Sequence, residues 1–201
     1  MCNIIGYLRE HGHETFAERS FCATDALILS QLSYIDWEGI VPERKRGAYG
    51  CQMRELLGIG KEQQMVRGSL YGPQNLCLVS VCANSRRFGE VKMFAYSSCC
   101  KKNVHLQFAA LAFLIPDEKI CVVFRGTDET VNGWQENFSM IYRDPVPAQE
   151  MAAKYLEEII VANSHNRIVV SGHSKGGNLA VYAAAKCRRN IRTMRPHRQS
   201  L

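Results

Sequence analysis

The chain has 201 residues, of which 46% are hydrophobic and 22% are charged, and these proportions exclude an intrinsically disordered protein. Its net charge of +6 comes from the last sixteen residues, which carry six basic residues and no acidic one, so the remainder is neutral. A short basic end is typical of a solvated tail, and we therefore expect no nucleic-acid partner.

One domain is expected, because this length supports a single sizeable core and no Pro/Gly/Ser-rich linker divides the chain. Residues 1–23 show no clear hydrophobic period and are predicted to be a loosely ordered lead-in. The domain itself is predicted over residues 24–187, and residues 188–201 form the basic tail. Its first helix is predicted to start with Thr24 as the cap and to end near Trp37.

The middle of the chain is rich in predicted strands. After a helix over residues 76–84, apolar runs predict strands over residues 91–97, 104–115 and 120–124. The turn at Pro116 makes the last two antiparallel neighbours, and their continuous apolar content predicts burial on both faces, as in an α/β sheet. A helix that begins after Pro145 then crosses over to one more strand, at residues 168–171.

The segment Gly172-His173-Ser174-Lys175-Gly176 is a G-x-S-x-G pattern between this apolar strand and an alanine-rich helix. Such a setting is typical of a nucleophile elbow, in which a serine on a strained turn exposes its hydroxyl and the flanking glycines leave room for close helix–strand packing. The alternative is a small-residue turn without chemistry. Because both the strand and the helix are present, the sequence favours Ser174 as a nucleophile.

Two separated motifs carry a resemblance to a known family. The segment Phe124-Arg125-Gly126-Thr127-Asp128 and the turn around Ser174, in this order, resemble the class 3 lipase branch of the α/β-hydrolases. The residues at 25–34, 145–149 and 175–180 further resemble a bacterial group of lipase-like proteins classed as a domain of unknown function. The resemblance runs from about Thr24 to Lys186. It implies an α/β-hydrolase-like central sheet with flanking helices and an ester or lipid substrate.

The resemblance also implies roles for single residues. Ser174 would be the nucleophile, while Thr127 and Lys175 would donate backbone N–H groups to an oxyanion hole, with Gly172 and Gly176 as the elbow glycines. The hydroxyl of Thr127 is a further candidate donor. We expect His173 to be a packed, hydrogen-bonded residue rather than the base, because it adjoins the serine, and Arg125 and Asp128 to pair in the loop. Serine hydrolysis needs no cofactor, and no metal-ligand spacing is present.

The sequence departs from the family after the serine. These hydrolases place an acid and then a histidine downstream, yet no acidic residue follows Ser174 and the only later histidine is His197. No predicted strand follows either, so we hypothesise a C-terminally shortened hydrolase with missing strands. The strand at residues 168–171 would then lie at an open sheet edge, which favours self-association.

Besides a less favoured reading, in which the basic tail binds an anionic membrane or a nucleic acid, two functions stay open at this point. The first is a serine hydrolase of lipase or esterase type, impaired because its triad is incomplete. The second is a non-catalytic remnant or interaction module that retains the fold. Nine cysteines without a C-x-x-C pair and the lack of a signal peptide predict a cytoplasmic protein, and the longest apolar stretch, residues 108–115, is too short for a transmembrane segment.

Overall fold

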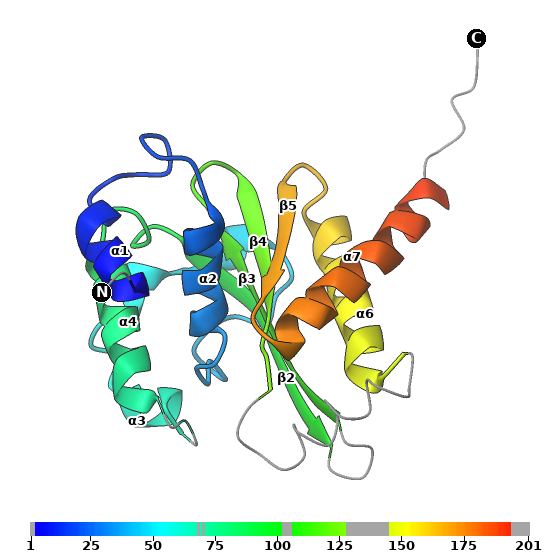
Figure 1. Ribbon diagram of the computed structural model, residues 1–201, viewed down its shortest axis with the longest axis horizontal. Coiled ribbons are helices and arrows are strands. Elements are labelled where there is room, and N and C mark those ends of the chain that lie inside the picture. The colour runs from blue at the N-terminus through cyan, green and yellow to red at the C-terminus, as the bar shows by residue number, and fades with distance from the viewer. Residues whose placement is uncertain (1–2, 68, 70, 102–105, 128–144, 194–201) are drawn as a thin grey trace.

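The computed structural model describes residues 3–67, 69, 71–101, 106–127 and 145–193 (Figure 1). A mixed sheet of five strands, in the order β1-β2-β3-β4-β5, forms its centre, and helices lie on both faces. The first four strands are antiparallel neighbours, whereas β5 runs parallel to β4. The predicted α/β class is confirmed. The strands are β1 (Cys51–Gln52), β2 (Lys92–Lys101), β3 (Leu106–Leu114), β4 (Lys119–Phe124) and β5 (Arg167–Gly172).

Helices form two layers around the sheet, on the left and the right of it in Figure 1. The layer on one face contains α1, α2 and α4, and that on the other contains α6 and α7, so the sheet separates two hydrophobic clusters. None of the described helices is long and apolar enough to cross a membrane. The helices are α1 (Ile4–His11), α2 (Ala23–Leu32), α3 (Glu62–Met65), α4 (Gly72–Asn84), α6 (Pro147–Ala162) and α7 (Lys175–Thr193), with short 3-10 turns η1 (Gly47–Tyr49) and η2 (Met53–Leu56).

The two central strands are buried on both faces, as their apolar content predicts. Strands β3 and β4 pair in antiparallel register from Ala110 opposite Phe124 to Leu114 opposite Ile120. Successive side chains alternate between the two clusters, so that Leu111 contacts the layer of α2 and Ala110 that of α6. Burial on both sides explains why these strands contain an almost continuous apolar run.

Helix α2 is shorter than the sequence predicts, because it ends at Leu32 and not near Trp37. The Trp37 indole N–H donates to the Leu32 carbonyl at 2.9 Å, so a side chain satisfies a carbonyl that another helical turn would have used. The predicted cap is also wrong. The helix begins after Cys22, whose backbone N–H donates to the Asp25 carboxylate at 2.8 Å.

The lead-in is not loosely ordered over its whole length, which corrects the prediction for this segment. Helix α1 lies within it and begins at the Asn3 side chain, whose Oδ1 accepts the Gly6 N–H at 2.8 Å. Leu8 is the buried residue of α1 and joins the cluster around α2 and α4. Because α1 buries a single apolar side chain, its sequence shows no hydrophobic period from which the helix could be predicted.

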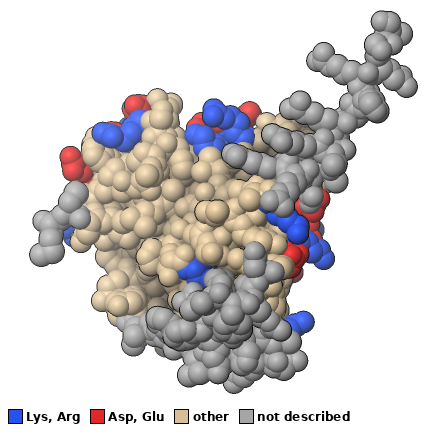
Figure 2. Space-filling model, turned by 45° about the vertical axis from the view of Figure 1, so that its right-hand side comes forward, with Lys and Arg blue, Asp and Glu red and all other residues tan. Residues whose placement is uncertain are grey.

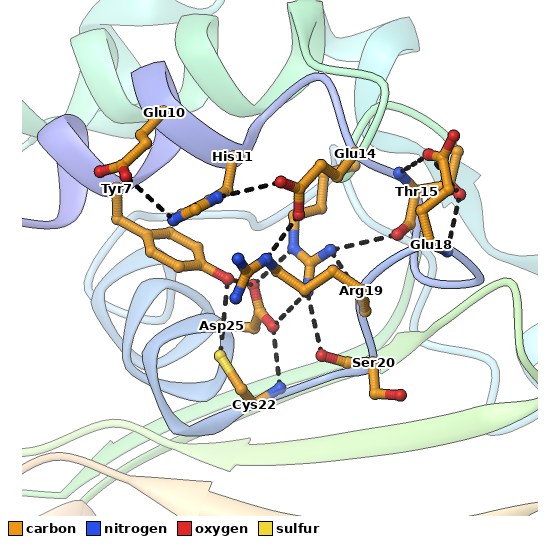
Figure 3. A network of polar contacts seen from close by, with 11 residues as sticks. Tyr7, Glu10, His11, Glu14, Thr15, Glu18, Arg19, Ser20, Cys22 and Asp25 are labelled. Atoms are coloured by element: carbon orange, nitrogen blue, oxygen red, sulfur yellow. Dashed lines mark hydrogen bonds and ion pairs between the residues drawn. The ribbon is translucent and has the colours of Figure 1, made fainter.

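A buried ion pair fixes α2 against this N-terminal segment. Arg87, in the connection between α4 and β2, and Asp25 in α2 are both fully buried. All five guanidinium N–H groups are used: two reach the Asp25 carboxylate, and three donate to the carbonyls of Thr15, Arg19 and Ser20. Figure 3 shows Asp25 also accepting the Tyr7 hydroxyl, at 3.1 Å. The network thereby positions the face of α2 that contacts β5.

Candidate functional site

The turn between β5 and α7 places Ser174 in a strained backbone conformation. Ser174 has a φ of +57°, which is uncommon for a residue other than glycine. Strand β5 ends at Gly172, and α7 begins at Lys175, so two residues make the whole change of direction. Strained backbone at a strand-to-helix turn is the geometry of a nucleophile elbow, and the Ser174 residue is exposed there.

Close packing around this turn explains both flanking glycines. A Cβ added to Gly172 would collide with the backbone of Gly176, and a Cβ added to Gly176 would collide with the Phe124 carbonyl oxygen at the end of β4. Helix α7 thus approaches both parallel strands so closely that no side chain fits between them. Any larger residue would displace the helix from the sheet and move the serine with it.

Thr127 lies three residues after β4, in the loop that leaves it. Because β4 and β5 are parallel, this loop and the serine turn follow the same end of the two strands. The Arg125 N–H donates to the Ala109 carbonyl at 2.9 Å and extends the pairing with β3 beyond the end of β4. The Thr127 hydroxyl oxygen is buried and has no hydrogen-bond partner among the described residues. A buried hydroxyl without a partner costs about 1–3 kcal/mol, so it marks a place where a ligand oxygen could be accommodated.

The side chain of Lys175 does not face solvent, although lysine is usually a surface residue. Lys175 is 3% exposed, and its ammonium donates to the carbonyl of Gln107 at 2.7 Å and to the Gln107 Oε1 at 3.1 Å. Its backbone N–H belongs to the first turn of α7, where N–H groups point out of the helix towards the turn. The backbone N–H of Lys175 therefore lies at the turn, while its side chain binds Gln107 of β3.

The C-terminal end of α2 and the loop after it border the turn on the other side. The Tyr34 hydroxyl lies 3.3 Å from Nδ1 of His173, and the hydroxyls of Ser30 and Ser171 are 3.0 Å apart. His173 makes a hydrogen bond, as expected, but it is exposed rather than packed. Because its ring contacts Tyr34, the geometry supports no role for it as the base of Ser174.

Several predicted residues lie outside the described part of the chain. Asp128, the expected partner of Arg125, falls in residues 128–144, and His197 falls in residues 194–201. Among the described residues, no three His, Cys, Asp or Glu side chains gather as a metal site would require. Of the predicted site residues, Ser174, Thr127 and Lys175 lie in the described part of the chain.

Sequence reasoning missed Gln107 and the contact of Tyr34 with His173. Gln107 is 2% exposed and is the one polar side chain in the apolar run of β3, which is the signal that could have marked it. Nothing in the sequence separates Tyr34 from other aromatic residues near a helix end, because its contact spans 139 positions.

A model of the Mbeg1-like family matches residues 82–197, which is more than half of the chain. The chain belongs to the Mbeg1-like family. The Mbeg1-like match includes β2 to β5, the serine turn and α7, and thus Thr127, Ser174 and Lys175 lie inside it. Helix α2, which borders the turn, lies before the matched residues. No curated protein and no solved structure matches the chain significantly, so the Mbeg1-like family is the relationship that sequence comparison supports.

Proposed function

We propose that this Mbeg1-like chain is a lipase-like α/β-hydrolase in which Ser174 is the nucleophile for hydrolysis of a carboxylic ester. One observation carries the proposal: a serine with a φ of +57° joins a strand to a helix with no space for side chains beside it. The buried hydroxyl of Thr127 has no partner in the described part of the chain, which supports an oxyanion hole at the carboxyl end of β4 and β5.

In this mechanism the Ser174 Oγ attacks the ester carbonyl carbon, and the carbonyl π electrons move to oxygen. The oxyanion accepts hydrogen bonds from Lys175 N–H and from Thr127, and the positive end of the α7 dipole stabilises the same charge. Collapse of this intermediate breaks the bond to the alcohol oxygen, which leaves with the proton of the Ser174 hydroxyl, and an acyl-serine remains. Water then attacks the acyl carbon, one of its protons returns to the Ser174 oxygen, and the acid is released.

The proposed activity is low. No acidic residue follows Ser174 in this sequence, and the one later histidine, His197, belongs to the basic tail. Serine hydrolases that lack triad residues retain about 10³-fold catalysis over water through the oxyanion hole and substrate binding. We therefore expect slow turnover of activated esters, with a substrate of the ester or lipid class.

Turnover of a p-nitrophenyl ester tests this proposal. The wild-type chain should release nitrophenolate faster than Ser174→Ala at equal concentrations of folded protein. Ser164→Ala is the matched control, because Ser164 is an exposed serine in the loop before β5. Equal rates for all three proteins would contradict an esterase activity at Ser174.

The second candidate function is an interaction module, and the exposed edge of the sheet favours it. In the described residues β5 has one strand neighbour, β4, and Ile168, Val169 and Val170 are only partly buried. Leu27 of α2 and Val181 of α7 are 47% and 72% exposed, on helices that contact β5 from opposite faces of the sheet. Figure 2 shows a mainly uncharged face here, with charged residues at its margins.

We propose a second copy of this chain as the occupant of that edge. The edge carries apolar groups on both faces, so it is complementary to itself in a two-fold interface. Antiparallel pairing of β5 with its copy would separate the two Arg167 side chains by the length of the strand, whereas parallel pairing would bring these like charges together.

Sedimentation velocity tests the dimer. Val181→Lys should shift the dimer to monomer, while Val161→Lys should not, because Val161 is 66% exposed on α6, a helix that packs on α7 and β3. A wild-type chain that is monomeric at all concentrations would contradict this candidate, as would a dimer that Val181→Lys leaves intact.

A further inference from the structure

The side chain of Lys175 is a buried anchor directly behind the proposed nucleophile. Its ammonium is enclosed with Gln107, which is 2% exposed, and donates to two oxygens of that residue at 2.7 and 3.1 Å. An ammonium leaves water only at a high free-energy cost unless hydrogen bonds replace its hydration. Two short contacts to one residue therefore define a specific position for the first turn of α7.

Gln107 lies on the strand that also borders the Thr127 loop. Strands β3 and β4 pair up to Ala110 opposite Phe124, and the bond from Arg125 N–H to the Ala109 carbonyl continues this pairing by one residue. Gln107 and Thr127 each lie two residues beyond this last printed bond, on β3 and on the loop after β4 respectively. The anchor of Lys175 and the Thr127 loop therefore both extend from the same end of the β3–β4 pair.

We propose that Lys175 is a positioning residue, whose side chain holds the start of α7 at a fixed distance from the Thr127 loop by binding Gln107. This inference rests on the proposed serine-hydrolase function, because in it the contact of Lys175 with Gln107 sets the distance between the two oxyanion donors, Lys175 and Thr127. Oxyanion stabilisation requires donors within a narrow range of distances, and a misplacement of about 1 Å can cost about 100-fold in rate.

Lys175→Met tests the anchor, because it removes the ammonium but keeps the backbone N–H and a side chain of similar length. The matched control is Lys186→Met on the same helix. The Lys186 side chain is 44% exposed, and its ammonium lies 3.7 Å from a carboxylate oxygen of Glu150. The probe is a fluorophosphonate, with its maximal labelling rate and its half-saturating concentration measured separately. We expect Lys175→Met to lower the maximal rate about 10- to 100-fold, with the half-saturating concentration within about twofold and the control unchanged.

Lys175→Gln keeps hydrogen-bond donors without the charge, and it should label faster than Lys175→Met. Hydrogen exchange adds a measurement that does not depend on activity: in Lys175→Met the amides of residues 125–127 and 175–178 should exchange faster than in the control. Wild-type labelling and unchanged exchange in Lys175→Met would overturn the proposal, and so would a uniform rise in exchange over the sheet. If the wild-type chain is not labelled, the proposed function fails and the exchange result alone decides whether the anchor exists.

Discussion

The guanidinium of Arg87 and the carboxylate of Asp25 are fully buried and joined by two hydrogen bonds of 2.8 and 2.7 Å. These residues come from segments 62 positions apart, so the pair connects α2 to the segment between α4 and β2. Its remaining donors hold the carbonyls of the loop before α2. The pair thus fixes the start of α2 and the loop before it against the segment between α4 and β2.

Breaking this pair should destabilise the whole fold. Arg87→Met leaves the Asp25 carboxylate buried without its counter-charge, and the free energy of unfolding should fall by about 3–5 kcal/mol. Adding Asp25→Leu to Arg87→Met should restore part of that loss, because no unpaired charge then remains buried. Urea unfolding followed by circular dichroism gives both values. A loss below about 1 kcal/mol for Arg87→Met would show that the pair does not hold α2 in place.

The crowding at the serine turn predicts a sharp contrast between two neighbouring glycines. Gly176→Ala places a methyl group against the Phe124 carbonyl, whereas a Cβ at Gly177 has its nearest neighbour at 3.2 Å. We expect Gly176→Ala to reduce the free energy of unfolding by more than about 3 kcal/mol and Gly177→Ala to change it by about 1 kcal/mol or less. Similar effects of the two substitutions in urea unfolding would contradict the packing described for α7.

Replacing Thr127 should change stability and reactivity in opposite directions. Thr127→Val removes a buried hydroxyl that has no partner among the described residues, and the free energy of unfolding should rise by about 1 kcal/mol. Labelling of Ser174 by a fluorophosphonate should fall about 10- to 100-fold if the hydroxyl contributes to the oxyanion hole. Thr127→Ser, which keeps the hydroxyl, is the control. Equal labelling rates of Thr127→Val and Thr127→Ser would show that the Thr127 hydroxyl does not contribute to the oxyanion hole.

Alkaline pH should destabilise the fold through the thiol of Cys121 in β4. Burial raises its pKa from the ordinary value of 9.0 to about 12, so the unfolded chain loses this proton at a lower pH than the folded chain. The thiol's contribution to stability is complete below pH 9 and declines as the pH rises towards 12. From pH 9 to pH 10, the free energy of unfolding should fall by about 1 kcal/mol more in the wild type than in Cys121→Val. Parallel pH profiles of the two proteins would contradict this assignment.

The sheet could be predicted from the sequence because its strands are encoded locally. Residues 106–114 and 119–124 are apolar runs around the turn at Pro116, and the structure pairs them as antiparallel neighbours. The crossover helix was equally clear, since Pro147 is its first residue and its apolar positions keep helical spacing. Such features depend on neighbouring residues alone.

The errors occurred where particular side-chain contacts, and not hydrophobic periodicity, decide the structure. Helix α2 ends at Leu32 because the Trp37 indole satisfies the Leu32 carbonyl, although the apolar pattern continues to Trp37. The buried state of Arg87 depends on a carboxylate 62 positions earlier, and in the sequence it is one of two adjacent arginines without any special pattern. The serine turn was visible as a motif. Gln107 is marked only as a polar residue in an apolar run, and its link to Lys175 spans 68 positions, so the pair could not be predicted.

The most direct test of a reactive Ser174 is the intact mass of the folded protein after treatment with a fluorophosphonate. The account predicts the mass increase of one probe in the wild type and in Ser164→Ala, and none in Ser174→Ala. Peptide mapping should place the probe on the segment that contains Ser174. A folded wild-type protein whose mass does not change, or that is labelled equally in Ser174→Ala, would contradict the proposed nucleophile.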